Sequence, residues 1–444
     1  MKKNTIIFSC SNCGAQSPKW SGRCLECGNW GTYHEEVIDP NEEKNKTPNS
    51  KPADMIDLNS INSGDCKRVS TNIDEFDRVL GGGIVPGSLI LIGGEPGIGK
   101  STLMLQLAGT IPSSIYISGE ESPQQVKSRM ERLGISGRTL KFISETNVEK
   151  ITSAIINAKP ALVIVDSIQT VYSNDAPSET GSVAQIRACT VKLLQAAKEN
   201  NITIIITGHI TKDGAIAGPK TLEHLVDTVI YLEQNKNQDY RILRTAKNRF
   251  GSTDEVGLFE MTGAGFTEIK NPTGIFLEKA AALEIPGTAI CCIMEGTRPF
   301  LIEVQALVTK TFFGYPQRKS SGIDLNRLQI LIAVLTRRAN VNLSNQDIHI
   351  NVVGGLKTDE TALDLAVCAA IISCFINKSI AKNTIILGEV GLGGEIRSVN
   401  KLDRRLQEAK KLGFSAALIP DTNTKSDLEL IKLKNVIELI NFLK

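Results

Sequence analysis

The sequence predicts an α/β protein whose central domain binds a nucleotide at the edge of a mostly parallel sheet. The first observation is segment 94–101, Gly-Glu-Pro-Gly-Ile-Gly-Lys-Ser, which fits the P-loop pattern G-x-x-x-x-G-K-[ST]. The second is the apolar run 161–165, which ends in Asp166. The third is an alternation of short β-prone runs with helical patterns, which is typical of a parallel sheet covered by helices on both faces.

The P-loop lies between an apolar run at 88–92, which we expect to be a strand, and a helical pattern at 101–108. Its glycines let backbone N–H groups point at phosphate oxygens, and the N-terminus of the following helix favours anions. We expect Lys100 to reach the β- and γ-phosphates and the Ser101 hydroxyl to ligate Mg²⁺. The predicted nucleotide-binding residues are Gly94, Glu95, Pro96, Gly97, Ile98, Gly99, Lys100, Ser101 and Thr102.

The remaining elements of this domain follow from periodicity and from the residues that end each run. An amphipathic helix at 73–80 ends at three consecutive glycines, 81–83. Further strands are predicted at 114–118, 141–143, 202–207, 226–232 and 240–245, and further helices at 122–133, 148–158 and 182–199.

Three polar side chains follow predicted strands and complete the expected site. Asp166 ends a buried run about 65 residues after the P-loop, which is the pattern of a Walker B strand with its carboxylate near Mg²⁺. Glu120 follows the strand at 114–118, and His209 follows the strand at 202–207. His209 either senses the γ-phosphate or packs and caps the strand end. Because ligands bind at the carboxyl ends of parallel strands, these groups are expected to meet the P-loop.

Length and composition allow two or three domains in a chain of 444 residues. The net charge of +2 does not by itself indicate a nucleic-acid-binding protein, and 10 cysteines with one N-terminal cluster indicate reduced thiols and a metal site. The N-terminus shows no signal-peptide pattern, and no apolar run approaches the ~20 residues of a membrane helix. We therefore expect a cytoplasmic protein with no membrane partner.

The first 34 residues contain two C-x-x-C pairs that suit one metal ion. Four thiolates in tetrahedral geometry favour structural Zn²⁺, and iron in a rubredoxin-like site is the alternative. The predicted ligands are Cys10, Cys13, Cys24 and Cys27. Trp20, Trp30 and Arg23 either contact nucleic acid or, in the case of the tryptophans, pack against the metal site. Residues 35–64 are polar and poor in aromatics, which predicts a flexible linker.

Segment 247–251, Lys-Asn-Arg-Phe-Gly, places two cations two residues apart. In extended structure Lys247 and Arg249 share one face. They form either a solvated basic turn or a pair that reaches phosphate, on DNA or on the nucleotide of a neighbouring subunit.

Residues 271–444 predict a second α/β domain without a P-loop. Its strands are expected at 289–294, 301–308, 348–353, 385–389 and 416–419, and its helices at 326–338, 360–376, 399–412 and 436–443.

Together these features resemble the RadA family of bacterial DNA-repair proteins, also called Sms. The resemblance rests on the four-cysteine ribbon, the P-loop, Tyr-Ile-Ser-Gly-Glu-Glu-Ser at 116–122 and Lys-Asn-Arg-Phe-Gly at 247–251. Segment 388–397, Gly-Glu-Val-Gly-Leu-Gly-Gly-Glu-Ile-Arg, is similar to the Lon-protease-like domain (S5 domain 2-like) of that family. The implied domains are a zinc ribbon (1–34), a linker (35–64), a RecA-like ATPase (65–270) and a Lon-like domain (271–444).

The resemblance implies an ATP hydrolase in a hexameric ring, a DNA-dependent, helicase-like motor that extends recombination intermediates. Its implied partners are single-stranded or branched DNA and the RecA recombinase. By similarity Glu120 activates the attacking water, His209 is a sensor, and Lys247 and Arg249 act on a neighbouring subunit's nucleotide or on DNA. Loops after Asp166 and His209 are expected to face DNA and to carry Arg187, Lys212 and Lys220.

Two other functions compete with this one. A Lon-type peptidase needs a Ser–Lys pair, but the matching positions hold Ala362 and Asp403; Thr361 and Lys401 offer only a shifted pair. A RecA-like signalling ATPase, which would turn over ATP without DNA, is opposed by the ribbon and by segment 247–251. The cations Lys401, Arg404, Arg405, Lys410 and Lys411 suit either DNA contacts or a solvated helix face.

Overall fold

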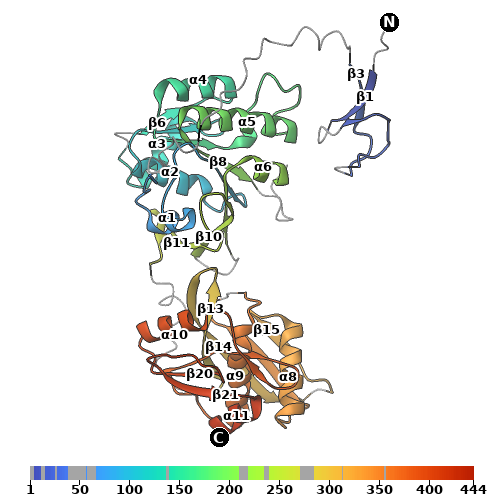
Figure 1. Cartoon of the computed structure of the whole chain (residues 1–444), viewed down its shortest axis with the longest axis vertical. Coiled ribbons are helices and arrows are strands. Elements are labelled where there is room, and N and C mark those ends of the chain that lie inside the picture. Colours follow the sequence, from blue (N-terminus) through green and yellow to red (C-terminus); the bar gives the residue numbers. More distant parts are fainter. Residues whose placement is uncertain are drawn as a thin grey trace. The chain divides into compact units, whose positions relative to one another are not determined.

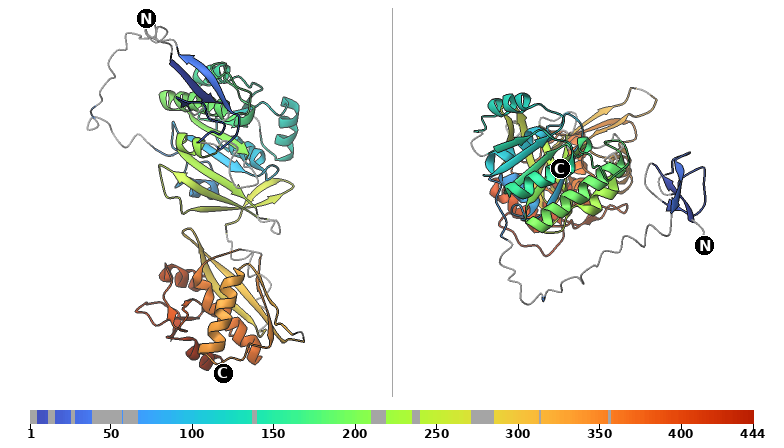
Figure 2. Two further views of the ribbon diagram at one scale, coloured as in Figure 1. Left: turned by 90° about the vertical axis from the view of Figure 1, so that its right-hand side faces the viewer. Right: turned by 90° about the horizontal axis from the view of Figure 1, so that it is seen from above.

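The computed structural model describes residues 5–11, 16–25, 28–38, 57, 67–136, 140–209, 219–234, 240–270, 285–312, 314–354 and 357–444. The chain divides into two compact units (Figures 1 and 2). The first comprises Met1–Glu233, Leu243–Thr253 and Met261–Thr267, and the second comprises Gln234–Ile242, Asp254–Glu260 and Glu268–Lys444.

The N-terminal segment forms a three-stranded antiparallel sheet in the order β2-β1-β3. Its strands are β1 (Thr5–Cys10), β2 (Gln16–Ser17) and β3 (Tyr33–Ile38). Cys10, at the end of β1, and Cys24, between β2 and β3, are both buried, whereas Trp20 and Trp30 are 62% and 76% exposed. Both tryptophan side chains are thus largely exposed, and contact with nucleic acid and packing against the metal site both stay predictions, since Cys13 and Cys27 lie outside the described residues.

A nine-stranded sheet in the order β12-β11-β10-β9-β4-β8-β7-β5-β6 follows. The six strands from β9 to β6 are parallel, as the alternation of runs predicted. These six are β4 (Leu89–Gly94), β5 (Ser114–Ser118), β6 (Leu140–Ile143), β7 (Leu162–Asp166), β8 (Thr203–His209) and β9 (Thr228–Glu233). The other three are β10 (Tyr240–Asn248), β11 (Val256–Thr262) and β12 (Gly265–Glu268).

Helices cover this sheet, and each expected helix is present within about two residues of its predicted bounds. They are α1 (Asp74–Leu80), α2 (Lys100–Thr110), α3 (Pro123–Arg132), α4 (Val148–Ala158) and α5 (Val183–Asn200). Alternate strand residues such as Leu89 and Leu91 pack with α4 and α5, because neighbouring residues of a strand point to opposite faces. The short helix α6 (Pro219–Leu225) and strands β11 and β12 were not predicted.

The C-terminal part forms a mixed seven-stranded sheet in the order β15-β16-β14-β13-β17-β20-β21. Its strands are β13 (Thr288–Glu295), β14 (Arg298–Lys310), β15 (Arg318–Ser321), β16 (Gln346–Val352), β17 (Thr384–Ile386), β20 (Ala416–Pro420) and β21 (Glu429–Leu433). A separate pair, β18 (Glu389–Val390) and β19 (Ile396–Arg397), lies in the segment that carried the Lon-like resemblance.

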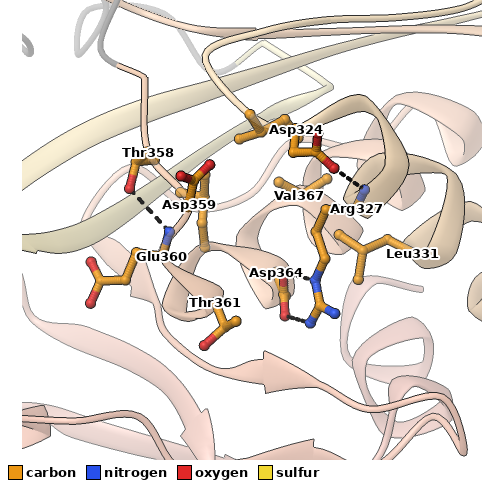
Figure 3. A pocket seen from close by; sticks show the side chains of 11 residues that line it. Asp324, Arg327, Leu331, Thr358, Asp359, Glu360, Thr361, Asp364 and Val367 are labelled. Atoms are coloured by element: carbon orange, nitrogen blue, oxygen red, sulfur yellow. Dashed lines mark hydrogen bonds and ion pairs between the residues drawn. The ribbon is translucent and has the colours of Figure 1, made fainter. Parts of the chain in front are cut away.

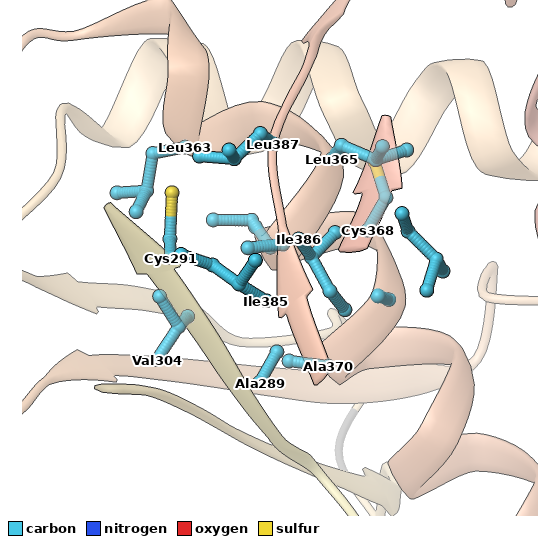
Figure 4. Packing of buried hydrophobic residues seen from close by; sticks show 14 of the residues in the cluster. Ala289, Cys291, Val304, Leu363, Leu365, Cys368, Ala370, Ile385, Ile386 and Leu387 are labelled. Atoms are coloured by element: carbon cyan, nitrogen blue, oxygen red, sulfur yellow. The ribbon is translucent and has the colours of Figure 1, made fainter. Parts of the chain in front are cut away.

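The helices of this part are α8 (Leu325–Arg338), α9 (Asp364–Ile376), α10 (Leu402–Lys411) and α11 (Val436–Leu443). Helix α9 is buried along most of its length, and Figure 4 shows Cys368 and Ala370 in one cluster with Ile385, Ile386 and Cys291. The helix predicted from residue 360 begins at Asp364, because residues 361–363 form the 3-10 turn η6 (Thr361–Leu363). Strands β15, β18, β19 and β21 were not predicted.

Within the described residues, no helix combines the length and apolar character that crossing a bilayer requires.

Candidate nucleotide site

The P-loop joins the buried strand β4 to helix α2, as its sequence predicted. Gly97 and Gly99 have φ angles of +79° and +110°, a region that favours glycine. A Cβ atom on Gly94 would lie 2.8 Å from the carbonyl oxygen of Leu232, and one on Gly99 would lie 2.8 Å from the ring of Phe266. Backbone conformation and close packing therefore both require glycine in this loop.

Lys100 is the first residue of α2, and its side chain turns back over the loop. Its ammonium donates to the carbonyl oxygens of Gly94 at 2.8 Å and Glu95 at 3.0 Å. Burial lowers the pKa of Lys100, while the carboxylates of Asp166 and Glu120 oppose that shift. A buried ammonium at this position suits phosphate oxygens, and the carboxylates of Asp166 and Glu120 are close enough to influence its pKa.

Asp166, at the carboxyl end of β7, is held by two hydroxyl groups. Thr207 Oγ1 donates to Oδ1 at 2.6 Å, and the Tyr116 hydroxyl donates to Oδ2 at 2.5 Å. Burial and the adjacent carboxylate raise the pKa of Tyr116 well above its ordinary value, so Tyr116 stays protonated and remains a donor. Each carboxylate oxygen keeps a further lone pair, which suits Mg²⁺ and its waters together with the Ser101 hydroxyl.

Glu120 is exposed beyond the end of β5, and Ser167 fixes its orientation. The Ser167 hydroxyl donates to Glu120 Oε1 at 2.7 Å, and Ser167 itself is buried beside Asp166. Tyr116, Thr207 and Ser167 were all missed by sequence reasoning. The signal for Ser167 was present, since it directly follows the Walker B aspartate, but its partner Glu120 lies beyond the end of a different strand, β5.

His209 ends β8, where strand pairing sets it beside Gly94 of β4. Its Nδ1 lies 3.2 Å from the Lys100 ammonium. Burial first, and then the Lys100 charge, lower the pKa of His209 below its ordinary value. Its imidazole is therefore mainly neutral near pH 7 and stands at the P-loop.

The structure thus brings Lys100, Glu120, Asp166 and His209 together at the carboxyl ends of the parallel strands. Their strand ends are in register, since Gly94 pairs with His209 and Ser118 pairs with Asp166. The charges of Lys100, Glu120 and Asp166 all act on the pKa of His209. Their exact roles in catalysis stay predictions.

Lys247 and Arg249 are not part of this cluster. Arg249 N donates to the carbonyl oxygen of Asp227, the residue before Thr228. Thr228 pairs with Ile90 at the beginning of β4, whereas Gly94 lies at the other end of that strand. Four residues of strand separate Ile90 from Gly94, or about 13 Å at ~3.3 Å per residue. Segment 247–251 therefore lies at the amino ends of the parallel strands, whereas the P-loop of the same chain lies at their carboxyl ends.

At that end of the strands, Lys247 forms hydrogen bonds to backbone carbonyl groups. Its ammonium donates to the carbonyl oxygens of Glu223 at 2.5 Å, Val226 at 2.8 Å and His224 at 3.3 Å, which lie at the C-terminal end of α6. Burial lowers the pKa of Lys247, and the neighbouring Arg249 charge adds to that effect. Lys247 is therefore a C-terminal cap of α6.

Arg249 differs from Lys247, because its side chain is 56% exposed. Its guanidinium lies 3.6 Å from the carboxylate of the buried Asp227, which also accepts from Lys198 at 2.7 Å. The five-residue segment is thus anchored through Lys247 and the backbone, while the Arg249 head group faces solvent at one end.

The expected DNA-facing cations are placed differently from the prediction. Arg187 lies on helix α5, exposed, and not in the loop after Asp166. Lys220 belongs to helix α6, and Lys212 lies outside the described residues. Helix periodicity at 182–199 was correct, and the error was to place Arg187 in the loop that precedes it.

Two of the predicted ribbon ligands, Cys13 and Cys27, lie outside the described residues. Cys10 and Cys24 are buried, and Cys10 Sγ lies 3.1 Å from Thr32 Oγ1. Thiols held inside so small a sheet fit the soft donor set that Zn²⁺ prefers.

The C-terminal part has no Ser–Lys arrangement at the position that the Lon pattern specifies. Ala362 is buried in η6, the Thr361 hydroxyl donates to Glu389 at 3.0 Å, and Lys401 donates to the carbonyl oxygen of Gly296 at 2.9 Å. The hydroxyl and the amine therefore have separate partners.

A pocket of about 100 Å³ adjoins Thr361. Figure 3 shows the ion pair of Arg327 and Asp364 on one side of it, with Thr361 and Glu360 on the other. Burial raises the pKa of Asp364, and the Arg327 guanidinium opposes that shift. This ion pair links α8 to α9 and provides no nucleophile.

Comparisons with known proteins agree with this geometry. An ATPase family model described as KaiC matches residues 69–142 and 136–266, and a rubredoxin metal binding domain model matches residues 8–35. A model of subunit ChlI of Mg-chelatase matches residues 324–423. The DNA repair protein RadA of Bacillus subtilis is 48% identical over 99% of both chains.

The chain belongs to the RadA family of DNA repair proteins. The RadA proteins of Listeria monocytogenes and Streptococcus pyogenes are 47% and 46% identical over 95% and 99% of this chain, and over 93% and 97% of their own lengths. The ATPase domain of G40P aligns with 47% of this chain and 93% of its own length at 15% identity and a TM-score of 0.41, which is too distant to support a conclusion. Family membership confirms the expected α/β ATPase fold with a ribbon.

Proposed function

We propose that this RadA-family chain is an ATP hydrolase that couples turnover to movement on single-stranded DNA during recombinational repair. The observation that carries the proposal is the convergence of Lys100, Glu120, Asp166 and His209 on the P-loop edge of the sheet. Phosphoryl transfer depends mainly on positioning and on charge stabilisation, and this cluster offers a cation, two carboxylates and a neutral imidazole.

Each side chain has a role that its contacts favour. Lys100 neutralises charge on the terminal phosphates. Glu120, oriented by Ser167, accepts a proton from the attacking water. His209 donates from Nε2 to a γ-phosphate oxygen while its Nδ1 faces Lys100. Mg²⁺, held through Ser101 and Asp166, would neutralise charge on the phosphate oxygens.

Lys247 and Arg249 lie at the amino ends of the parallel strands, opposite the P-loop of their own chain. If Arg249 contacts a nucleotide, that nucleotide belongs to another copy of the chain. This position supports a closed homo-oligomer, which the family resemblance extends to a hexameric ring. DNA is the alternative contact for Arg249, and RecA recombinase is the proposed protein partner.

The remaining proposals concern cofactors, domains and location. We infer structural Zn²⁺ in the ribbon, Mg²⁺ with ATP, and the domain bounds 1–34, 35–64, 65–270 and 271–444. A cytoplasmic location follows from a DNA partner. Neither a signalling ATPase nor a peptidase has a specific observation in its favour, and the separated Thr361 and Lys401 oppose the peptidase.

The deciding experiment is steady-state ATP hydrolysis with and without single-stranded DNA, comparing the wild-type chain with Lys100→Ala. We expect DNA-stimulated turnover in the wild type and, in the variant, a loss of at least ~10²-fold, the usual effect of removing a group that stabilises transition-state charge. Turnover that ignores DNA would favour the signalling ATPase instead.

A further inference from the structure

Segment 247–251 is hydrogen-bonded to Arg68, a side chain that lies outside the nucleotide site. The Arg68 guanidinium donates through Nη2 to the carbonyl oxygen of Phe250 at 2.5 Å, across 182 positions of the chain. Its Nη1 donates to the carbonyl oxygens of Leu80 at 2.8 Å and Gly83 at 3.3 Å. One side chain therefore joins segment 247–251 to the C-terminal end of helix α1.

The end of α1 makes a second contact with the same segment. Leu80 is the last residue of α1, and its carbonyl oxygen also accepts from Asn248 Nδ2 at 3.3 Å. The backbone next to Arg68 is anchored as well, since Val69 and Ile84 exchange two N–H to carbonyl bonds, both of 2.8 Å. Arg68 therefore extends to segment 247–251 from a fixed backbone.

Both peptide groups that flank the Cα atom of Arg249 are hydrogen-bonded. Arg249 N donates to the carbonyl oxygen of Asp227 at 3.1 Å, and Phe250 N donates to Asn248 Oδ1 at 3.0 Å. The next peptide group along the chain is the one whose carbonyl oxygen accepts from Arg68. Because the backbone has two soft dihedral angles per residue, three bonded peptide groups in a row fix the direction in which the Arg249 side chain leaves the backbone.

The outer part of the Arg249 side chain is open to solvent. The side chain is 56% exposed, and Nη1 lies 3.6 Å from Asp227 Oδ1. The ring of Phe250 is held separately, because Lys198 Nζ lies 5.7 Å from its centroid and donates to Asp227 Oδ2 at 2.7 Å. A guanidinium that acts on phosphate needs such support, since a displacement of about 1 Å can lower a rate by ~10²-fold.

We propose that Arg68 is a positioning residue for Arg249, which holds the second peptide group after the Arg249 Cα atom and thereby directs its guanidinium toward phosphate. This inference rests on the proposed function, in which Arg249 contacts DNA or the nucleotide of another copy. The alternative is that Arg68 serves α1 alone, since a cation beside the last carbonyl groups of a helix is favourable by itself. The bond to Phe250 opposes that alternative, because a cap of α1 needs Leu80 and Gly83 but not residue 250.

The test compares full-length Arg68→Met with the wild type in steady-state ATP hydrolysis over a series of single-stranded DNA concentrations. We expect the DNA-stimulated rate to fall by up to ~10²-fold, because Arg249 is displaced while the P-loop contacts are unchanged. An increase in the DNA concentration for half-maximal stimulation would identify DNA as the source of the phosphate. A lower maximal rate at an unchanged half-maximal concentration would identify the nucleotide of another copy.

A matched control separates positioning from a general loss of stability. Thr245→Val removes another side-chain bond to the end of α1, which joins Thr245 Oγ1 to the carbonyl oxygen of Val79 at 2.9 Å. It leaves the bond from Arg68 to Phe250 in place, so DNA stimulation should be retained even where urea unfolding shows lower stability. Hydrogen exchange of a peptide that spans 248–251 is the second readout. Exchange should be faster in Arg68→Met and unchanged in Thr245→Val.

Should Arg68→Met fail to fold, Arg68→Lys takes its place. This variant keeps the charge at the end of α1, but one nitrogen replaces the two amines that bond Leu80 and Phe250 separately. We therefore expect a folded chain whose DNA stimulation falls by a smaller factor. Wild-type stimulation together with wild-type hydrogen exchange in Arg68→Lys would assign Arg68 to α1 alone.

Full DNA stimulation in Arg68→Met would overturn the inference, and so would an equal loss in Thr245→Val. A loss of stimulation without faster hydrogen exchange at 248–251 would also contradict it, because Arg68 would then act by another route. If Arg249→Met loses stimulation and Arg68→Met keeps it, this inference fails while the proposed function stands. A wild-type chain whose turnover ignores DNA would instead remove the proposed function.

Discussion

The Lys100 ammonium lies 3.2 Å from Nδ1 of His209. An ammonium group can only donate, so Nδ1 accepts, and the proton of the neutral imidazole belongs on Nε2. This assignment follows from the hydrogen-bond partner, and it leaves Nε2 as a donor at the P-loop edge.

The first prediction concerns the pH dependence of turnover. Because burial and Lys100 lower the pKa of His209, turnover should be flat above about pH 6.5, the ordinary histidine value, and fall only as pH drops through the lowered pKa. The unfolded chain takes up this proton at higher pH, so the stability gained from the neutral form is present above ~6.5 and lost below it. His209→Gln keeps an N–H donor and should lose the acidic limb in a pH–rate profile. An unchanged limb in that variant would assign the titration to another group.

The second prediction separates positioning from binding at Glu120. Glu120→Gln should lower kcat by roughly 10²- to 10⁴-fold with little change in ATP affinity, since general-base catalysis contributes that much. Ser167→Ala should lower kcat less, and Ser167→Thr, which keeps the hydroxyl, should restore it. A change in KM without a change in kcat for Ser167→Ala would contradict its role in orienting the carboxylate.

The third prediction contrasts the two cations of segment 247–251. Lys247→Met should destabilise the folded chain by about 1–3 kcal/mol, because it removes charged hydrogen bonds to the end of α6. Arg249→Met should change stability by less than about 1 kcal/mol, since its ion pair is solvent-exposed.

For DNA-stimulated turnover we expect the reverse order, with a larger effect of Arg249→Met than of Lys247→Met. Arg249→Met should spare ATP binding and abolish DNA stimulation, measured by steady-state hydrolysis alongside urea unfolding. Retained stimulation would remove the proposed role of Arg249.

The fourth prediction concerns the ribbon. Cys10→Ser should reduce bound zinc, measured by atomic emission on purified protein, from the expected one ion per chain to a substoichiometric level, because a structural site needs all four ligands. Cys189→Ser, a buried cysteine of α5, is the control and should retain zinc. Undiminished zinc in the Cys10 variant would refute the ligand assignment, and iron in place of zinc in the wild type would favour the rubredoxin-like alternative.

Local pattern was enough for the P-loop, for Asp166 at the end of β7 and for most helix bounds, because each depends on periodicity and spacing within a short segment. The same logic placed Glu120 and His209 at strand ends. Elements such as α6, β11 and β15 escaped prediction because their sequences lack a clear apolar period.

The tertiary structure decided which residues, distant in sequence, become hydrogen-bond partners. Thr207 and Tyr116 meet Asp166 only because β8, β7 and β5 pair in register, and no local pattern encodes that order. The sequence by itself determined that this chain binds a nucleotide and contains two cations in segment 247–251. Only the tertiary structure decided that Lys247 caps α6 opposite the P-loop. The hydrogen bonds of its ammonium join residues that are distant in sequence and that meet only when the chain folds.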